Sequence, residues 1–184
     1  MPLPAPSLPL LRRTLAPLAA ATALLLSACA GMGPGKPASW APPQALVAPS
    51  SFTGVHGLAV DKQGRLLAGS VVGNAIWEVD RNTGAAKILV GGPEGQADDI
   101  AIGPKGEMAW TNYLSGAVRI RDNDQQPSRV IASGLPGLNS LNFDQRNGKL
   151  YATQVFLGDA LWELDPSGAK PPRLIGKDFG GLNG

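Results

Sequence analysis

Short runs of alternating apolar and polar residues, separated by turns that end in glycine, recur from residue 56 to the end of the chain. The run 76–80 (IWEVD) alternates in this way and returns as LWELD at 161–165. A period of two is typical of β-strands, and a turn that ends in glycine, such as 61–64, closes a hairpin. Within each repeat the pattern predicts four strands. The expected strands are 57–60, 65–69, 76–80 and 86–90; 99–102, 107–111, 118–122 and 129–132; and 140–143, 149–153, 161–165 and 172–175.

These strands fall into repeats with a common opening. The opening reads HGLAV at 56–60, DDIAI at 98–102 and NSLNF at 139–143, and residues 183–184 begin it again. A period of about 40–45 residues built from short strands indicates a β-propeller with one four-stranded blade per repeat. The predicted fold class is therefore all-β, a β-propeller. Its predicted blades are 56–97, 98–138 and 139–182, three blades of an expected six.

The sequence stops inside the opening of a fourth repeat. Three blades would leave sheet edges open to pairing with other strands. We therefore expect an N-terminal fragment of a longer reading frame, monomeric when full length. The alternative is a half-propeller that dimerises into six blades.

The N-terminus predicts export and lipidation. Arg12 and Arg13 precede an apolar stretch, 15–26, that is too short to cross a bilayer, and LSAC at 26–29 resembles the lipobox of bacterial lipoprotein precursors. That resemblance implies a signal peptide at 1–28 and acylation of Cys29, hence a lipid-anchored protein of the bacterial cell envelope, on the outer membrane and facing the periplasm. An ordinary signal peptide is the alternative. Residues 29–51 are rich in Gly and Pro and predict a flexible tether, followed by the propeller at 52–184.

Charge and cysteine content exclude some partners. The chain has 16 basic and 14 acidic residues and a net charge of +2, and Arg12 and Arg13 account for that excess. There is no basic run, so nucleic acid is not expected as a partner. Cys29 is the single cysteine, so no internal disulfide is possible.

The residues that open each repeat are polar, and the topology places them together. The first strand of a blade lines the channel of a propeller, so His56, Asp98, Asn139 and Asn183 are expected around one mouth. Ser70, Asn112 and Gln154 are expected near them, beneath the apolar loops 71–73, 113–115 and 155–157. Polar groups under an apolar rim predict a small-molecule site.

The phrases DDIA at 98–101 and LNSLNF at 138–143 resemble those of the SMP-30/gluconolactonase propellers, and more loosely the NHL-repeat and strictosidine-synthase-like ones. The likeness covers about 52–184 and implies hydrolysis of a lactone or related ester with one divalent cation, Ca²⁺ or Zn²⁺. By position it implies Asp98, Asn139 and Asn183 as ligands of that cation. His56 stands where the family pattern would place an acid.

The residue types support this chemistry in part. Carboxylate and amide oxygens suit Ca²⁺, and a bound cation polarises a carbonyl group. His56, the only histidine, and Asp99 are the candidate catalytic residues, because imidazole and carboxylate groups accept protons. The alternative is that these side chains only satisfy backbone N–H groups at the strand starts.

Three functions remain open from the sequence. The first is a metal-dependent hydrolase of a lactone or small ester. The second is a non-enzymatic propeller that binds a ligand or partner, and the third is an enzyme like the streptogramin lyases, which use histidine. Glu78 and Glu163 are expected on solvated strand faces and Trp77 and Trp162 between blades. Trp110 fits either packing or ligand stacking.

Overall fold

The computed structural model describes residues 42–47 and 54–184. Residues 45–184 form one compact unit; of the other unit, 1–44, only 42–44 are described, and they form no strand. The predicted signal peptide, Cys29 and almost all of the tether lie outside the described residues. Within the described part, no helix is long and apolar enough to cross a membrane.

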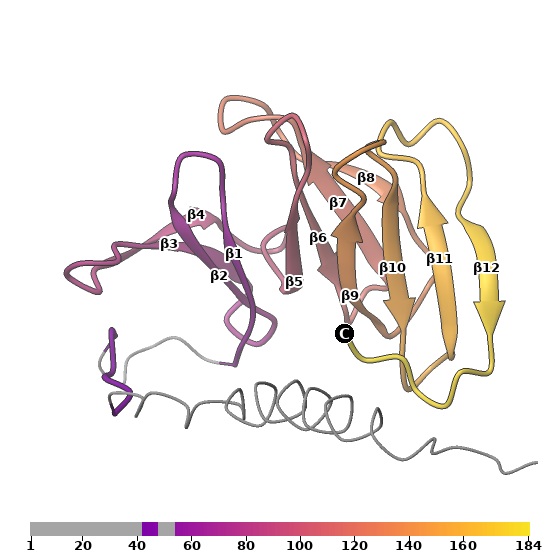
Figure 1. The fold of residues 1–184 in the computed structure, drawn as a ribbon, viewed down its shortest axis with the longest axis horizontal. Helices are drawn as coiled ribbons and strands as arrows, with labels where there is room; N and C mark the ends of the chain where they lie inside the picture. Colours follow the sequence, from indigo (N-terminus) through magenta and orange to yellow (C-terminus); the bar gives the residue numbers. More distant parts are fainter. Residues whose placement is uncertain (1–41, 48–53) are drawn as a thin grey trace, which may run out of the picture. The chain divides into compact units, whose positions relative to one another are not determined.

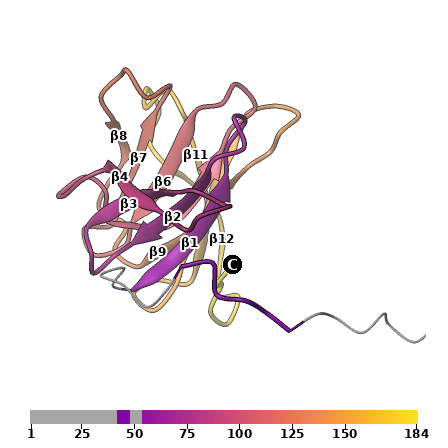
Figure 2. The ribbon, with the colours of Figure 1, turned by 90° about the vertical axis from the view of Figure 1, so that its left-hand side faces the viewer.

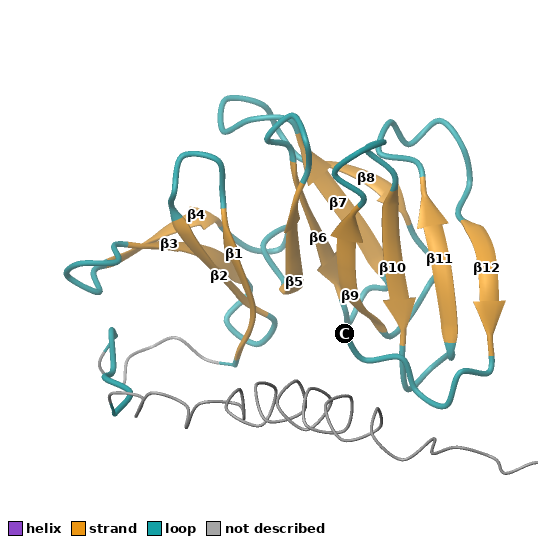
Figure 3. Ribbon diagram, viewed as in Figure 1, coloured by secondary structure: helices purple, strands orange, loops and turns teal. Residues whose placement is uncertain are grey.

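Residues 54–184 consist of strands and loops (Figure 3), which form three antiparallel sheets of four strands each. Each sheet follows the chain order of its strands, so each is one blade made of consecutive hairpins. The all-β architecture predicted from the repeat is confirmed. Blade 1 contains β1 (Val55–Val60), β2 (Leu66–Ser70), β3 (Ala75–Val79) and β4 (Ala86–Val90); blade 2 contains β5 (Ala97–Ile102), β6 (Met108–Asn112), β7 (Ala117–Arg121) and β8 (Arg129–Ala132); blade 3 contains β9 (Leu138–Phe143), β10 (Leu150–Gln154), β11 (Ala160–Leu164) and β12 (Arg173–Lys177).

The first strands of the blades lie side by side. β5 contacts β1 on one side and β9 on the other, and the outer strands lie away from this centre (Figure 1). The close approach depends on Gly57, because a Cβ atom there would lie 2.7 Å from the carbonyl oxygen of Asp98. Figure 2, turned so that blade 1 faces the viewer, shows β1 and β2 in front of the other blades.

The hydrophobic core lies between the blades rather than inside any one of them. Leu67 and Ile76 of blade 1 form one cluster with Ile100 and Trp110 of blade 2. A second cluster joins Val118 and Ile120 of blade 2 to Leu141 and Phe143 of blade 3, with Trp162 packed against it. Trp110 is fully buried, so it serves packing, and Trp162 packs between blades as predicted.

The two glutamates that recur on the third strands carry ion pairs. Glu78 binds Arg65 and Lys87, and Glu163 binds Lys149 and Arg173. Both are half-buried on the strand surface, and Glu163 also borders a hollow with Lys149 and Arg173.

Candidate functional site

The four polar residues that open the repeats line one pocket. Its walls hold His56, Asp98, Asn139 and Asn183, and it has a volume of about 360 Å³. Gly57, Asp99, Ser140 and Phe156 complete the lining. The grouping expected from the blade topology is thus present, whereas the catalytic and metal-binding roles of these residues stay predictions.

A β-bulge recurs where each inner strand meets its second strand. Val55 pairs with Ser70, and the next pair is Leu58 with Ala68. Between these two pairs β1 contains one more residue than β2. The same shift lies between Ala97 and Ile100 and between Leu138 and Leu141. The bulges start at His56, Asp98 and Asn139, and bulges of this kind re-aim side chains next to functional sites. The inner strands consequently begin earlier than the sequence pattern predicted.

Among the described residues that line the pocket, His56 and Asp98 form the one pair of an imidazole and a carboxylate in contact. Nδ1 of His56 lies 3.1 Å from Oδ1 of Asp98, and the His56 side chain is 56% exposed whereas that of Asp98 is 6% exposed. Burial raises the pKa of Asp98, the nearby imidazole opposes this, and Asp99 adds to it. When the ring is neutral with its proton on Nδ1, facing this carboxylate, the lone pair on Nε2 can accept a proton.

Asp99 is engaged by the backbone of two blades. Its Oδ1 accepts the N–H of Ile100 at 2.9 Å and its Oδ2 that of Leu141, in blade 3, at 3.0 Å. Burial raises the pKa of Asp99, and these two hydrogen bonds act against the rise. Oδ2 therefore joins β5 to β9, while Oδ1 binds within β5, which gives Asp99 a structural role beside the catalytic one that was predicted for it.

The donors available to a cation are few. Asp98 supplies one carboxylate, which already contacts His56, and Asn139 supplies an amide oxygen that accepts from Ser140 Oγ at 3.1 Å. Asn183 is exposed in the segment after β12. No group of three or more His, Cys, Asp or Glu side chains placed to hold a metal ion occurs among residues 42–47 and 54–184. Because Ca²⁺ takes about 6–8 oxygen ligands, the described residues do not complete a site for it.

Three polar residues expected near the mouth serve the backbone instead. Ser70, Asn112 and Gln154 end the second strands and are buried, and none lines the pocket. Ser70 Oγ accepts from the N–H of Gly73, and Gln154 Nε2 donates to the carbonyl of Pro136. Of the loops expected to overhang the site, only 155–157 contributes, through Phe156.

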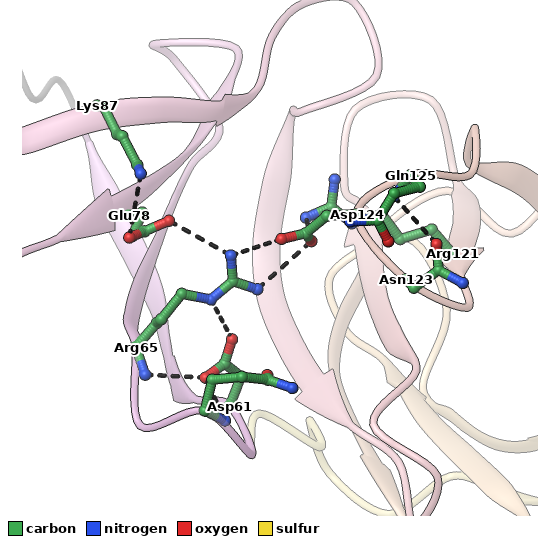
Figure 4. A network of polar contacts seen from close by, with 9 residues as sticks. Asp61, Arg65, Glu78, Lys87, Arg121, Asn123, Asp124 and Gln125 are labelled. Carbon is green, nitrogen blue, oxygen red and sulfur yellow. Dashed lines mark hydrogen bonds and ion pairs between the residues drawn. The ribbon is translucent and has the colours of Figure 1, made fainter.

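An ion network away from this pocket was not predicted from the sequence (Figure 4). Arg65 lies between Asp61, Glu78 and Asp124, and Arg121 binds the same Asp124. Arg65 belongs to blade 1 and Asp124 to a loop of blade 2, so the network joins the two blades. Its hydrogen bonds lower the pKa of Asp124.

Comparison with known proteins shows the fold. No protein-family model and no curated protein matches the sequence. Similar structures include a chain of the nidogen/laminin complex (TM-score 0.60, 19% identity, 70% of this chain and 50% of that chain). A streptogramin B lyase is also similar (TM-score 0.58, 16% identity, 71% of this chain and 43% of that chain). So is a gluconolactonase from Xanthomonas campestris (TM-score 0.56, 16% identity, 79% of this chain and 59% of that chain).

These likenesses define the class of protein to which the three sheets belong. The three sheets are blades of a β-propeller, and the chain resembles six-bladed propellers in particular. The chain spans about half the length of the structures that it matches. Lactonases, lyases and binding proteins share this fold, so the fold leaves the function to be argued from the pocket.

Proposed function

We propose that the pocket at the bulged strand starts binds a small carbonyl compound and that the protein hydrolyses a lactone or a related small ester there. The observation that carries the proposal is the pair of an exposed imidazole and a buried carboxylate, His56 and Asp98, 3.1 Å apart. A carboxylate that holds Nδ1–H fixes the tautomer whose Nε2 is a base. The likeness to a gluconolactonase supports this choice among the functions of the fold.

The proposed reaction uses groups of the chain. Nε2 of His56 takes a proton from a water molecule whose oxygen bonds to the carbonyl carbon, and the buried carboxylate of Asp98 stabilises the resulting imidazolium. The C–O bond of the lactone ring then breaks, and His56 returns the proton to the departing alkoxide oxygen. The amide of Asn139, whose oxygen already accepts from Ser140, has its NH₂ available to donate to the carbonyl oxygen.

We add to this proposal the divalent cation that the sequence predicts. Asp98, Asn139 and Asn183 would hold Ca²⁺ or Zn²⁺, and the ion would polarise the carbonyl group. The described donors are fewer than Ca²⁺ takes, and the proton transfers above are assigned to His56 and Asp98.

Hydrolysis of a panel of γ- and δ-lactones, followed by acid release with and without a chelator, tests the proposal. His56→Gln and Asp98→Asn are expected to lower the rate by about 100-fold or more, the usual contribution of a general base. The Asp122 side chain lies outside the pocket and is 52% exposed, so Asp122→Asn is the matched control and is expected to retain the rate. An unchanged rate in His56→Gln would contradict the proposal, and loss of rate with chelator alone would assign the step to the cation.

A second candidate is ligand binding without chemistry. Phe156 is 75% exposed at the pocket, which suits a hydrophobic ligand. The chain holds one histidine, so the ring signals of His56 in an NMR spectrum report on the pocket without overlap. Ligands that move these signals but are not hydrolysed favour a binding protein.

A lyase is the third candidate, and a streptogramin tests it. One of the similar structures is a catalytically inactive virginiamycin B lyase variant with quinupristin. Quinupristin therefore belongs in the panel, and its cleavage in a His56-dependent manner would favour lyase over lactone hydrolase.

We also propose that the protein is held at the bacterial envelope by a lipid on Cys29 and faces the periplasm. The sequence around Cys29 supports this. Cys29→Ala is expected to move the protein from the membrane fraction to the soluble fraction. Retention in the membrane fraction would contradict lipid anchoring.

A further inference from the structure

The loop after the second strand of blade 3 differs from the same loop in the other two blades. Val72, Leu114 and Phe156 each stand two positions after the end of the second strand, and all three are exposed apolar residues. Of these three, Phe156 alone has a positive φ, of 60°, and Phe156 alone lines the pocket at the bulged strand starts. The repeated loop thus departs from its pattern at the residue that reaches the pocket.

The backbone at Phe156 forms a γ-turn. The N–H of Leu157 donates to the carbonyl of Val155 at 2.7 Å, a hydrogen bond that spans the single residue Phe156. With a positive φ at the central residue, this is the rarer of the two forms of γ-turn, and it is strained when that residue carries a side chain. Strain of this kind persists where the surrounding structure fixes it, and it gathers at ligand sites.

Both ends of the loop 155–159 are anchored to neighbouring segments. Val155 is buried, and its N–H donates to the carbonyl of Gly137 at 2.9 Å. A Cβ atom at Gly137 would collide with the carbonyl oxygen of Val155, so the two segments are in close contact. At the other end, the carboxylate of Asp159 accepts the N–H of Gly180 at 2.7 Å. These contacts fix the γ-turn between them before any ligand binds.

Phe156 gives the pocket an apolar wall. Its residue is 75% exposed, so its ring contributes little to the core. An aromatic ring on a fixed backbone offers a flat apolar surface at low cost in entropy, and it pairs favourably with a second ring. Among the described residues that line the pocket, Phe156 brings the one large apolar side chain; the others are His56, Gly57, Asp98, Asp99, Asn139, Ser140 and Asn183.

We propose that Phe156 determines the specificity of this pocket and that the substrate is a lactone or small ester with an aromatic substituent, which stacks on the Phe156 ring. The inference rests on the function proposed above for the polar part of the pocket. The polar side chains bind the carbonyl end of the substrate, and the Phe156 ring binds the other end. The volume of about 360 Å³ lies within the range of small-molecule sites.

Two lactones with the same ring test the proposal, a γ-butyrolactone with a phenyl substituent and one with a cyclohexyl substituent of similar size. We expect the native protein to favour the phenyl compound in kcat/KM. Phe156→Leu keeps an apolar side chain without the ring and is expected to lower this preference about 2- to 10-fold, the contribution of an aromatic pair. Phe156→Tyr keeps the ring and is expected to retain the preference. Leu114→Ala is the matched control, because Leu114 holds the same repeat position, is 65% exposed and lies outside the pocket.

Phe156→Gly separates a role in specificity from a role in folding. Glycine adopts a positive φ freely and an exposed ring gives up little packing, so the midpoint of urea unfolding should not fall. The preference for the phenyl compound should nevertheless disappear. A lower midpoint would show that the ring serves the fold and would overturn the proposal.

Binding of the corresponding γ-lactams distinguishes a failure of this inference from a failure of the proposed function, because a lactam keeps the carbonyl group and resists hydrolysis. The ring signals of His56, the only histidine, report the binding. Binding of the phenyl lactam that depends on Phe156, with no lactone hydrolysed, would support this inference and contradict the hydrolase. Hydrolysis of both lactones with the same preference in native and Phe156→Leu protein would support the hydrolase and overturn this inference.

Discussion

Thr111 Oγ1 lies 2.6 Å from the carbonyl oxygen of Asn139 and thereby ties the second strand of blade 2 to the first strand of blade 3. The same hydroxyl oxygen accepts the N–H of Asp99 at 3.1 Å. Thr111 is fully buried, so both backbone groups depend on this side chain. One hydroxyl therefore fixes the backbone beside Asp98 and at Asn139, two of the residues that line the pocket.

Thr111→Val removes these hydrogen bonds at nearly constant volume. The N–H of Asp99 and the carbonyl of Asn139 would lose a partner in a buried place, so we expect the free energy of unfolding to fall by about 1–3 kcal/mol. Urea unfolding measures the change, and the slope should stay as in the native protein. Thr153→Val is the matched control, because Thr153 Oγ1 lies 3.5 Å from the carbonyl of Ser140 and makes a weaker bond. Equal losses in the two variants would contradict this account.

The sequence was sufficient to predict the blades because the packing contacts repeat. Leu58, Ile100 and Leu141 follow the same spacing, and the last two are buried in equivalent contacts between blades. The convergence of His56, Asp98 and Asn139 on one pocket could also be predicted, because it depends only on the alternating directions of the strands. The bulges could not be, since the extra residue falls at the polar start of each inner strand, before the alternating run that predicts the strand.

The sequence pattern could not predict which groups the side chains bind. Ser70 and Gln154 are polar residues at strand ends, and only the path of the neighbouring loop shows that they bind backbone groups. Asp99 is adjacent to Asp98 in the sequence, yet one carboxylate binds two backbone N–H groups while the other contacts His56. Arg65 meets Asp124, 59 residues away, through the geometry of two blades.

Asp124→Asn tests how far that contact stabilises the pairing of blades 1 and 2. Asp124 Oδ2 and Oδ1 lie 2.6 Å from Arg65 Nη1 and Arg121 Nη2, and the Asp124 side chain is 36% exposed. After allowance for solvent screening, we expect a loss of about 1–2 kcal/mol in the free energy of unfolding near neutral pH. Asp122→Asn, on an exposed pair with Arg129, is expected to lose less than about 1 kcal/mol.

The loss in Asp124→Asn should depend on pH in a defined direction. The hydrogen bonds from Arg65, with the charge of Arg121, hold the pKa of Asp124 below its ordinary value. A carboxyl group with a lowered pKa in the folded state contributes stability above the unfolded pKa of about 3.9, and this contribution disappears as the pH falls through the folded pKa. The difference between native and variant should therefore be full at neutral pH and shrink below about pH 4. A difference that is the same at low pH would rule out the charge as its source.

Gly57→Ala is expected to separate the first two blades at the pocket. The new Cβ would lie 2.7 Å from both the carbonyl oxygen of Asp98 and the Cα of Asp99, and backbone atoms of a paired strand cannot rotate away. Overpacking of this kind costs about 1–3 kcal/mol, which urea unfolding measures. Because Gly57 follows His56 directly, the His56–Asp98 contact should lengthen, and the ring signals of His56 should move. Gly91→Ala is the control, since its Cβ would meet only Ile88 Cγ2 at 3.9 Å. If Gly57→Ala keeps the stability and the ring signals of the native protein, the close approach of β1 and β5 is not what holds His56 against Asp98.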